Sequence, residues 1–129
     1  MSIFTPEQEL GPYRIVEQIG RGGMATVFKA YHTALDRYVA IKVPETNFQA
    51  NPEVLARFQR EVKIIARLDH PNIVPIYDVS EFEGTPYLVM RFVEGRTLRE
   101  FLSQYKKPVS LTTVLMIMRA VTSALAFAH

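Results

Sequence analysis

The chain has 129 residues, of which 48% are hydrophobic and 22% are charged, with 15 basic and 13 acidic side chains. This is the composition of one globular domain, and the mild net charge of +2 gives no support for a nucleic-acid-binding surface. Because the chain has no cysteine, disulfide scaffolds, cysteine-ligated zinc and thiol nucleophiles are excluded. Residues 1–12 lack a basic start and an apolar stretch, so no secretory signal is indicated and we expect a cytoplasmic protein.

The first part of the chain predicts strands separated by turns. Residues 13–19 alternate apolar and polar side chains, and residues 26–31 are again rich in β-branched and aromatic side chains. Between them, residues 20–23 contain three of the six glycines, which predicts a hairpin with a glycine-rich turn. A third strand is predicted over 38–43, and Pro44 ends it.

A long helix is predicted from Pro52 to Leu68, because Asn51 before a proline is a typical helix start and apolar side chains recur with helical period. Two more strands are predicted over 73–80 and 86–92. Five antiparallel strands with one long helix make the fold class α+β.

Two helices are predicted near the end of the chain. Thr97 and Glu100 have the spacing of a capping box for a short helix to about residue 105, and Ser110 is a suitable cap for the next helix. Residues 111–128 are the most apolar segment, but polar side chains and Arg119 interrupt it, so we expect a core helix rather than a membrane span. Its wide apolar stripe needs neighbours that the sequence does not supply, which predicts an exposed apolar patch.

The glycine-rich turn is a candidate phosphate-binding element, because a backbone without Cβ can bring its N–H groups close to phosphate oxygens. A dinucleotide-binding fingerprint requires a helix after the glycines, whereas a strand is predicted here, so a dinucleotide-binding enzyme is disfavoured. A Walker loop requires Gly-Lys-Ser/Thr, which the sequence lacks. A hairpin that covers phosphates remains, and a plain flexible turn is the simpler alternative.

Lys42 and Glu61 are two charged residues that are candidates for an ion pair near the glycine-rich hairpin. Lys42 shares a strand face with Ala40, whose small side chain leaves space. Glu61 stands in a helical stripe whose other members are apolar: Val54, Phe58, Ile65 and Leu68. A buried carboxylate needs a cation, and we expect Lys42 to provide it. The alternative is a weak surface pair of Glu61 with Arg57, one turn earlier.

In this order, the motifs resemble the small lobe of a protein kinase, most closely the eukaryotic-like serine/threonine kinases of bacteria. The segment Ile19–Val27 resembles the phosphate-covering loop, Ala40–Lys42 the lysine strand, and Glu61 the partner of that lysine. His70–Ile73 resembles the junction after the helix, and Tyr87–Gly95 is similar to the last strand and the hinge.

The resemblance implies an N-terminal extension at 1–12, the small lobe and hinge at 13–95, and the incomplete start of the large lobe at 96–129. It also implies that Lys42 holds the α- and β-phosphates of ATP and that Glu61 positions this lysine, as the catalytic pair. The nucleotide-binding residues that it implies are Ile19, Gly20, Gly22, Gly23, Val27, Ala40, Lys42, Met90, Arg91 and Val93.

Within that set, Ile19, Val27 and Ala40 would sandwich the adenine, and Met90 would be the gatekeeper. The backbone carbonyl of Arg91 and the backbone N–H and carbonyl of Val93 would bind the adenine edge. The sequence departs from the family pattern at Ala25, which replaces the third glycine of the loop, and at Arg91, where an acidic residue is common.

The family also uses Mg²⁺, held by an Asn and by the Asp of an Asp-Phe-Gly motif, and a further Asp that orients the hydroxyl of the protein substrate. Asp36, Asp69 and Asp78 are the three aspartates, and none stands in such a motif. We therefore expect no metal ligands here, a chain that stops before the catalytic loop, and no turnover by this chain alone. The parent would phosphorylate protein Ser or Thr; a small-lobe dimer and a downstream membrane anchor are compatible with the resemblance. The alternative is a pseudokinase-like regulatory or protein-interaction module.

Overall fold

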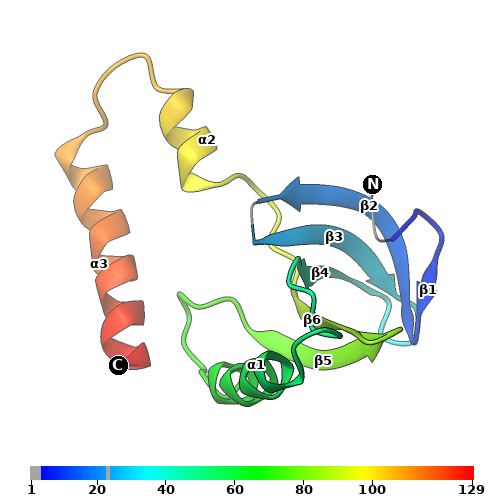
Figure 1. Cartoon of the computed structure of the whole chain (residues 1–129). Helices are drawn as coiled ribbons and strands as arrows, with labels where there is room; N and C mark the ends of the chain where they lie inside the picture. The colour runs from blue at the N-terminus through cyan, green and yellow to red at the C-terminus, as the bar shows by residue number, and fades with distance from the viewer. Residues whose placement is uncertain (1–3, 23) are drawn as a thin grey trace. The chain divides into compact units, whose positions relative to one another are not determined.

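The computed structural model describes residues 4–22 and 24–129. Along the chain, the elements are β1 (Glu9–Leu10), β2 (Tyr13–Arg21), β3 (Ala25–His32), β4 (Arg37–Pro44), α1 (Pro52–Ile65), β5 (Ile76–Phe82), β6 (Thr85–Arg91), α2 (Leu98–Ser103) and α3 (Leu111–Ala128) (Figure 1). Two compact units result. The first comprises residues up to Arg67 together with Pro75–Phe92, and the second comprises Leu68–Val74 together with Val93–His129.

The six strands form one antiparallel sheet in the order β1-β2-β3-β4-β6-β5. The α+β fold class is confirmed, and the sheet has one strand more than the five we predicted. The additional strand, β1, pairs only Glu9 with Arg14 and Leu10 with Tyr13. A strand of two residues is too short to show the alternation on which the prediction depends.

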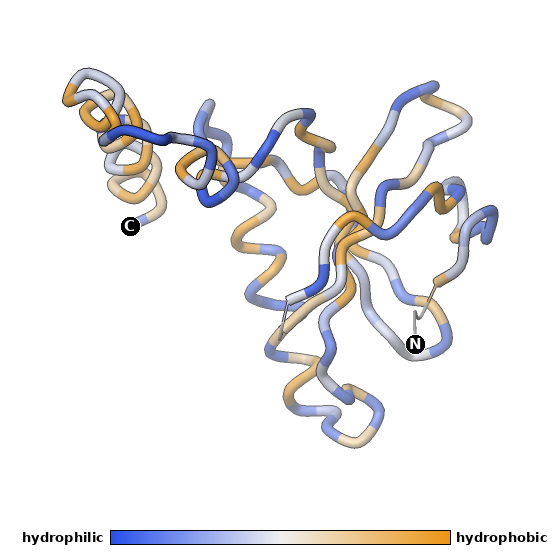
Figure 2. The backbone as a smooth tube through the Cα atoms, turned by 90° about the horizontal axis from the view of Figure 1, so that it is seen from above, coloured by the Kyte–Doolittle hydropathy of each residue, from blue (hydrophilic) through white to orange (hydrophobic). Residues whose placement is uncertain are grey.

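The two faces of the sheet have different roles, and β4 shows this most clearly. Val39, Ile41 and Val43 are fully buried in the core of the first unit, whereas Lys42 on the opposite face is exposed. Ile41 pairs with Phe28 on one side and Val89 on the other, so the core crosses the strands in register. In Figure 2 the apolar segments of the strands converge in this unit.

Side chains from strands that are not neighbours in the sheet meet, which shows that the sheet is curled. The hydroxyl of Tyr13 on β2 donates to Oδ2 of Asp78 on β5 at 3.5 Å. The guanidinium of Arg37 on β4 lies 4.1 Å from the ring centroid of Tyr77 on β5. Burial, followed by the negative charge of Asp78, raises the pKa of Tyr13.

Helix α1 has a narrow contact with the rest of the first unit. Of its residues, all of which are described, Val62 is the one that is buried. Phe58 is half-buried, and its ring lies 5.1 Å from that of Phe48 in the preceding loop. The helix ends at Ile65, three residues before the predicted end at Leu68.

In the second unit, both predicted helix caps are confirmed. The side chain of Thr97 accepts from the N–H of Glu100 at 3.1 Å while the N–H of Thr97 donates to the Glu100 carboxylate at 3.2 Å, which is a capping box. Ser110 accepts from the N–H of Thr113 at 3.2 Å at the start of α3.

The loop before β5 is attached to α3 through His70. Its Nδ1 accepts from the N–H of Asn72 at 3.0 Å. In a neutral imidazole the other nitrogen then carries the proton, so Nε2 donates to Oγ of Ser123, also at 3.0 Å. His70 therefore has a structural contact in this loop.

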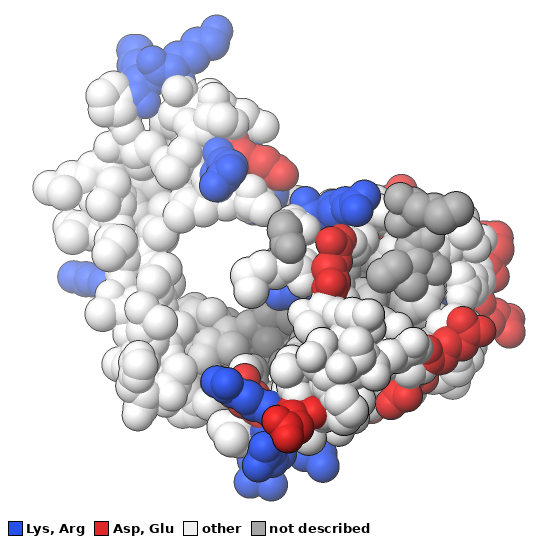
Figure 3. Space-filling view, in the orientation of Figure 1, with Lys and Arg blue, Asp and Glu red and all other residues white. Residues whose placement is uncertain are grey.

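Helix α3 leaves its apolar surface uncovered. None of its residues, each of which is described, is buried, and its visible face in Figure 3 is almost wholly uncharged. The predicted exposed apolar patch is confirmed, whereas the prediction of a core helix is wrong for this chain because no neighbour in the described residues covers it. By length and composition alone, α3 is also the one described helix that could cross a membrane.

Candidate functional site

The hairpin between β2 and β3 is formed as predicted, and its tip closes with a hydrogen bond from the N–H of Gly22 to the carbonyl of Ala25 at 2.9 Å. A Cβ at Gly20 would meet Val27 at 3.9 Å, and one at Gly22 would meet only a carbonyl at 4.0 Å. A residue with a Cβ would therefore fit at either position without a clash inside the chain. The predicted site residue Gly23 lies outside the described residues.

A pocket of about 430 Å³ lies next to this hairpin tip. The hairpin, β4, α1 and β6 all contribute to its lining, which consists of Met24, Ala25, Lys42, Pro44, Thr46, Phe48, Val54, Arg57, Phe58, Glu61 and Leu88. Lys42 and Glu61 thus line one cavity, although they come from different elements. The structure brings together the two charged residues that the sequence made important.

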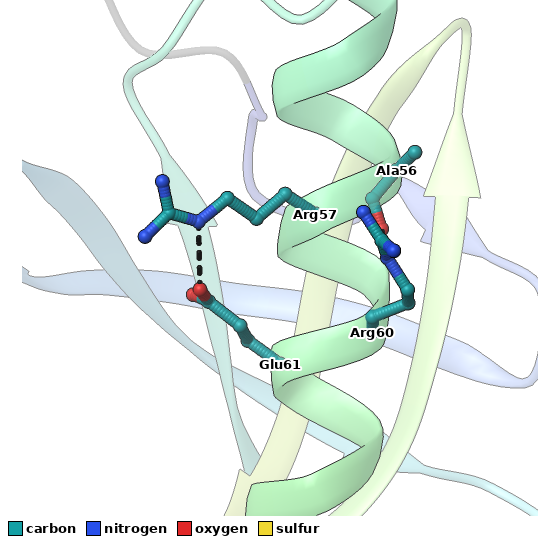
Figure 4. A network of polar contacts seen from close by, with 4 residues as sticks. All are labelled: Ala56, Arg57, Arg60 and Glu61. Carbon is teal, nitrogen blue, oxygen red and sulfur yellow. Dashed lines mark hydrogen bonds and ion pairs between the residues drawn. The ribbon is translucent and has the colours of Figure 1, made fainter.

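Glu61 is nevertheless paired with Arg57 and not with Lys42. Nε of Arg57 donates to Oε1 of Glu61 at 2.8 Å, and Figure 4 shows the two side chains together on one side of α1. This hydrogen bond and the charge of Glu61 raise the pKa of Arg57. Of the ion pairs between described residues, none joins Lys42 to Glu61.

The expected Lys42–Glu61 ion pair is therefore wrong for this conformation. The expectation on which it depended, that the Glu61 carboxylate is buried, is also wrong. The side chain of Glu61 is 56% exposed, because α1 turns Val62, one residue further, toward the sheet. A carboxylate in contact with water does not need a buried cation, and the local partner four residues earlier is always within reach.

Three predicted adenine contacts share the face of the sheet that carries Lys42. Val27 pairs with Lys42 across β3 and β4, and Ala40 pairs with Met90 across β4 and β6. Partners in register lie on the same face, and Ala40 is two residues from Lys42, so the four side chains form a continuous surface. Ile19 lies where the β2–β3 register shifts, and its side chain is exposed.

The remaining predicted contacts lie where β6 ends. The N–H of Arg91 donates to the carbonyl of Pro75 at 3.1 Å, so this donor serves the fold. Val93 is exposed and belongs to the second unit. Their adenine-binding roles stay predictions. Across the described ranges, no three His, Asp or Glu side chains gather as a metal site would require.

Sequence reasoning missed Glu45 altogether. Its carboxylate contacts Arg21 and Thr26 at the hairpin tip. Glu45 follows the proline that ends β4, and nothing in its local sequence separates it from an ordinary surface glutamate.

Comparison with known proteins gives a family for this fold and this site. Residues 13–129 match the protein kinase domain family. Over 118 residues the chain is 48% identical to the probable serine/threonine-protein kinase PknB of Lactococcus lactis. This match covers 91% of this chain and 19% of that protein. Over 119 residues it is 44% identical to the serine/threonine-protein kinase PrkC of Bacillus subtilis. This match covers 92% of this chain and 18% of that protein.

A solved structure agrees with these relatives. The PknI kinase domain of Mycobacterium tuberculosis superposes with a TM-score of 0.83 at 30% identity, and the match covers 98% of this chain and 51% of that one. The chain thus spans about a fifth of the length of the two curated relatives and about half of the solved domain. The resemblance stated from the motifs is confirmed: the chain belongs to the protein kinase domain family, and its relatives include bacterial serine/threonine kinases.

Proposed function

We propose that this chain is the ATP-binding portion of a serine/threonine protein kinase, whose parent transfers the γ-phosphoryl group of ATP to a protein hydroxyl. The observation that carries the proposal is that Lys42 and Glu61 line one pocket beside the glycine-rich hairpin. Catalysis of phosphoryl transfer depends on positioning and on neutralising phosphate charge, and a lysine with a carboxylate partner performs both tasks.

In this proposal, the ammonium group of Lys42 contacts the α- and β-phosphates. At Gly20 and Gly22 the chain leaves open the space that a Cβ would fill. Because glycine has no Cβ, phosphate oxygens can use this space to approach the backbone. The surface of Val27, Ala40 and Met90, next to Lys42 on the same face, receives the adenine ring.

Glu61 has to leave Arg57 before it can orient Lys42. Both partners of the present pair are largely exposed, with side-chain exposures of 75% for Arg57 and 56% for Glu61. Solvent and salt screen such a pair, so its loss opposes the change only weakly. We infer that Glu61 exchanges Arg57 for Lys42 when the phosphates are bound.

We propose that the chain binds nucleotide but does not transfer phosphate alone. The described residues contain no carboxylate cluster for Mg²⁺, and the three aspartates of the sequence stand outside the family motifs. Because α3 lies within the stretch that matches the kinase domain family, we interpret it as a helix of a cytoplasmic domain rather than as a membrane span.

Calorimetric titration with ATP and with adenosine tests this function. Lys42→Ala should weaken ATP binding by roughly tenfold or more, because a charge-assisted contact is lost, and should leave adenosine binding nearly unchanged. Lys63→Ala, on the exposed surface of α1, is the matched control and should bind both ligands like the unaltered chain. Absence of ATP binding, or equal affinity of Lys42→Ala and the unaltered chain, would refute the proposal.

A further inference from the structure

The carboxylate of Glu45 joins the tip of the glycine-rich hairpin to the end of β4. Its Oε1 accepts from Oγ1 of Thr26 at 2.8 Å and lies 3.4 Å from Nε of Arg21. Arg21 on β2 and Thr26 on β3 are direct cross-strand partners, so one oxygen contacts both strands of the hairpin. The N–H of Glu45 also donates to the carbonyl of Met24 at 3.0 Å. We call these contacts of Glu45 with Arg21, Met24 and Thr26 the tip tether.

The side-chain part of the tip tether lies on the face of the sheet opposite to Lys42. Thr26 is 5% exposed and pairs with Val43, which is fully buried on the core face. Lys42, the next residue along β4, faces the other way. A second pocket of about 310 Å³ shares Pro44 and Thr46 with the pocket of Lys42. Glu45, Arg21 and Thr26 line this second pocket, and none of these three lines the pocket of Lys42. The Glu45 side chain therefore contacts the hairpin on the face of the sheet that is opposite to Lys42.

This placement determines what the tether can do for a ligand. Glycines increase the conformational entropy that a loop loses when it is ordered, and this loss weakens binding. A contact that already holds the hairpin tip in the free chain reduces that loss. Arg21 lies within ion-pair distance of the Glu45 carboxylate, so the tether places little uncompensated negative charge near incoming phosphates.

We propose that Glu45 is a positioning residue that holds the hairpin tip beside Lys42 and thereby strengthens binding of phosphate-bearing nucleotides over adenosine. The inference rests on the proposed function, since it concerns the same site. The partners of the Glu45 carboxylate, Thr26 and Arg21, do not line the pocket of Lys42, so the effect of this carboxylate on the nucleotide passes through those two residues.

The binding test uses the 129-residue chain with ATP and adenosine as probes. Glu45→Ala and Thr26→Val should each weaken ATP binding by roughly three- to tenfold and change adenosine binding by less than about twofold. Thr26→Ser keeps the hydroxyl and should restore the ATP affinity. Glu81→Ala, which removes an exposed carboxylate on β5, is the matched control. Unchanged ATP affinity, or equal losses for ATP and adenosine, would overturn the inference, since equal losses indicate a merely structural role.

A second measurement does not need nucleotide. Amide hydrogen exchange of the free chain should show faster exchange at Gly22 and Glu45 in Thr26→Val than in Thr26→Ser, because both N–H groups bond within the tethered tip. Equal exchange in the two variants would overturn the inference even if the chain binds ATP. If the unaltered chain binds no nucleotide, the proposed function fails and this inference fails with it. Faster exchange in Thr26→Val would then show that the tether exists without a nucleotide role.

Discussion

Replacing Val62 with alanine should make helix α1 open locally more often while the sheet stays folded. Val62 is the buried residue of α1, at 4% exposure, and it is not part of the core cluster that joins the strands. Alanine lacks two of its methyl groups, and at about 0.8 kcal/mol for each buried carbon plus a cavity term the loss is roughly 2 kcal/mol. The higher helix propensity of alanine returns about 0.5 kcal/mol.

The net loosening of about 1.5 kcal/mol corresponds to roughly tenfold faster exchange of α1 amides. Native-state hydrogen exchange measures this directly, with amides of β4 as the internal reference. Ile64→Ala is the matched control, because Ile64 is 65% exposed on the same helix and its loss should not loosen α1. If α1 and β4 amides accelerate equally in Val62→Ala, the helix and the sheet unfold as one unit and the reasoning is wrong.

Three further predictions concern charge, pH and helix capping. Arg57→Gln should raise ATP affinity about two- to fivefold by releasing Glu61, whereas Arg60→Gln, on the other side of α1 in Figure 4, should not; equal effects would contradict this. Since the pKa of Tyr13 is raised above its ordinary value of 10.0, the folded chain keeps a proton that the unfolded chain loses. The free energy of unfolding should therefore fall as pH rises above that value, and a Tyr13→Phe chain with the same slope would refute the assignment. Thr97→Ala should destabilise α2 by about 1 kcal/mol, measured as faster amide exchange in α2 alone, and unchanged exchange would argue against the capping box.

Alternation along a strand was a dependable guide to the faces of the sheet. Val39, Ile41 and Val43 are buried and Lys42 is exposed, as a period of two requires. A strand of eight residues repeats this pattern often enough to be recognised, whereas the two residues of β1 do not. The pairing of β1 depends on the tertiary structure alone.

Helical period was a weaker guide to which face of α1 is buried. The stripe predicted from the sequence runs through Val54, Phe58 and Glu61, and a second apolar stripe runs through Leu55, Phe58 and Val62. Neighbouring helix positions differ by about 100°, so a small rotation of α1 exchanges the two stripes. The sheet selects the second stripe and leaves Glu61 exposed. Sequence reasoning found two residues that line the pocket, Lys42 and Glu61, but not the partner of Glu61, because Arg57, one turn earlier on the same helix, competes with Lys42.

The structure of this chain bound to a non-hydrolysable ATP analogue tests the central claim most directly. The account predicts that Nζ of Lys42 contacts the α- and β-phosphates and lies within about 4 Å of a carboxylate oxygen of Glu61, with Arg57 released. An analogue bound away from Lys42, or phosphates bound while Glu61 stays on Arg57, would contradict it.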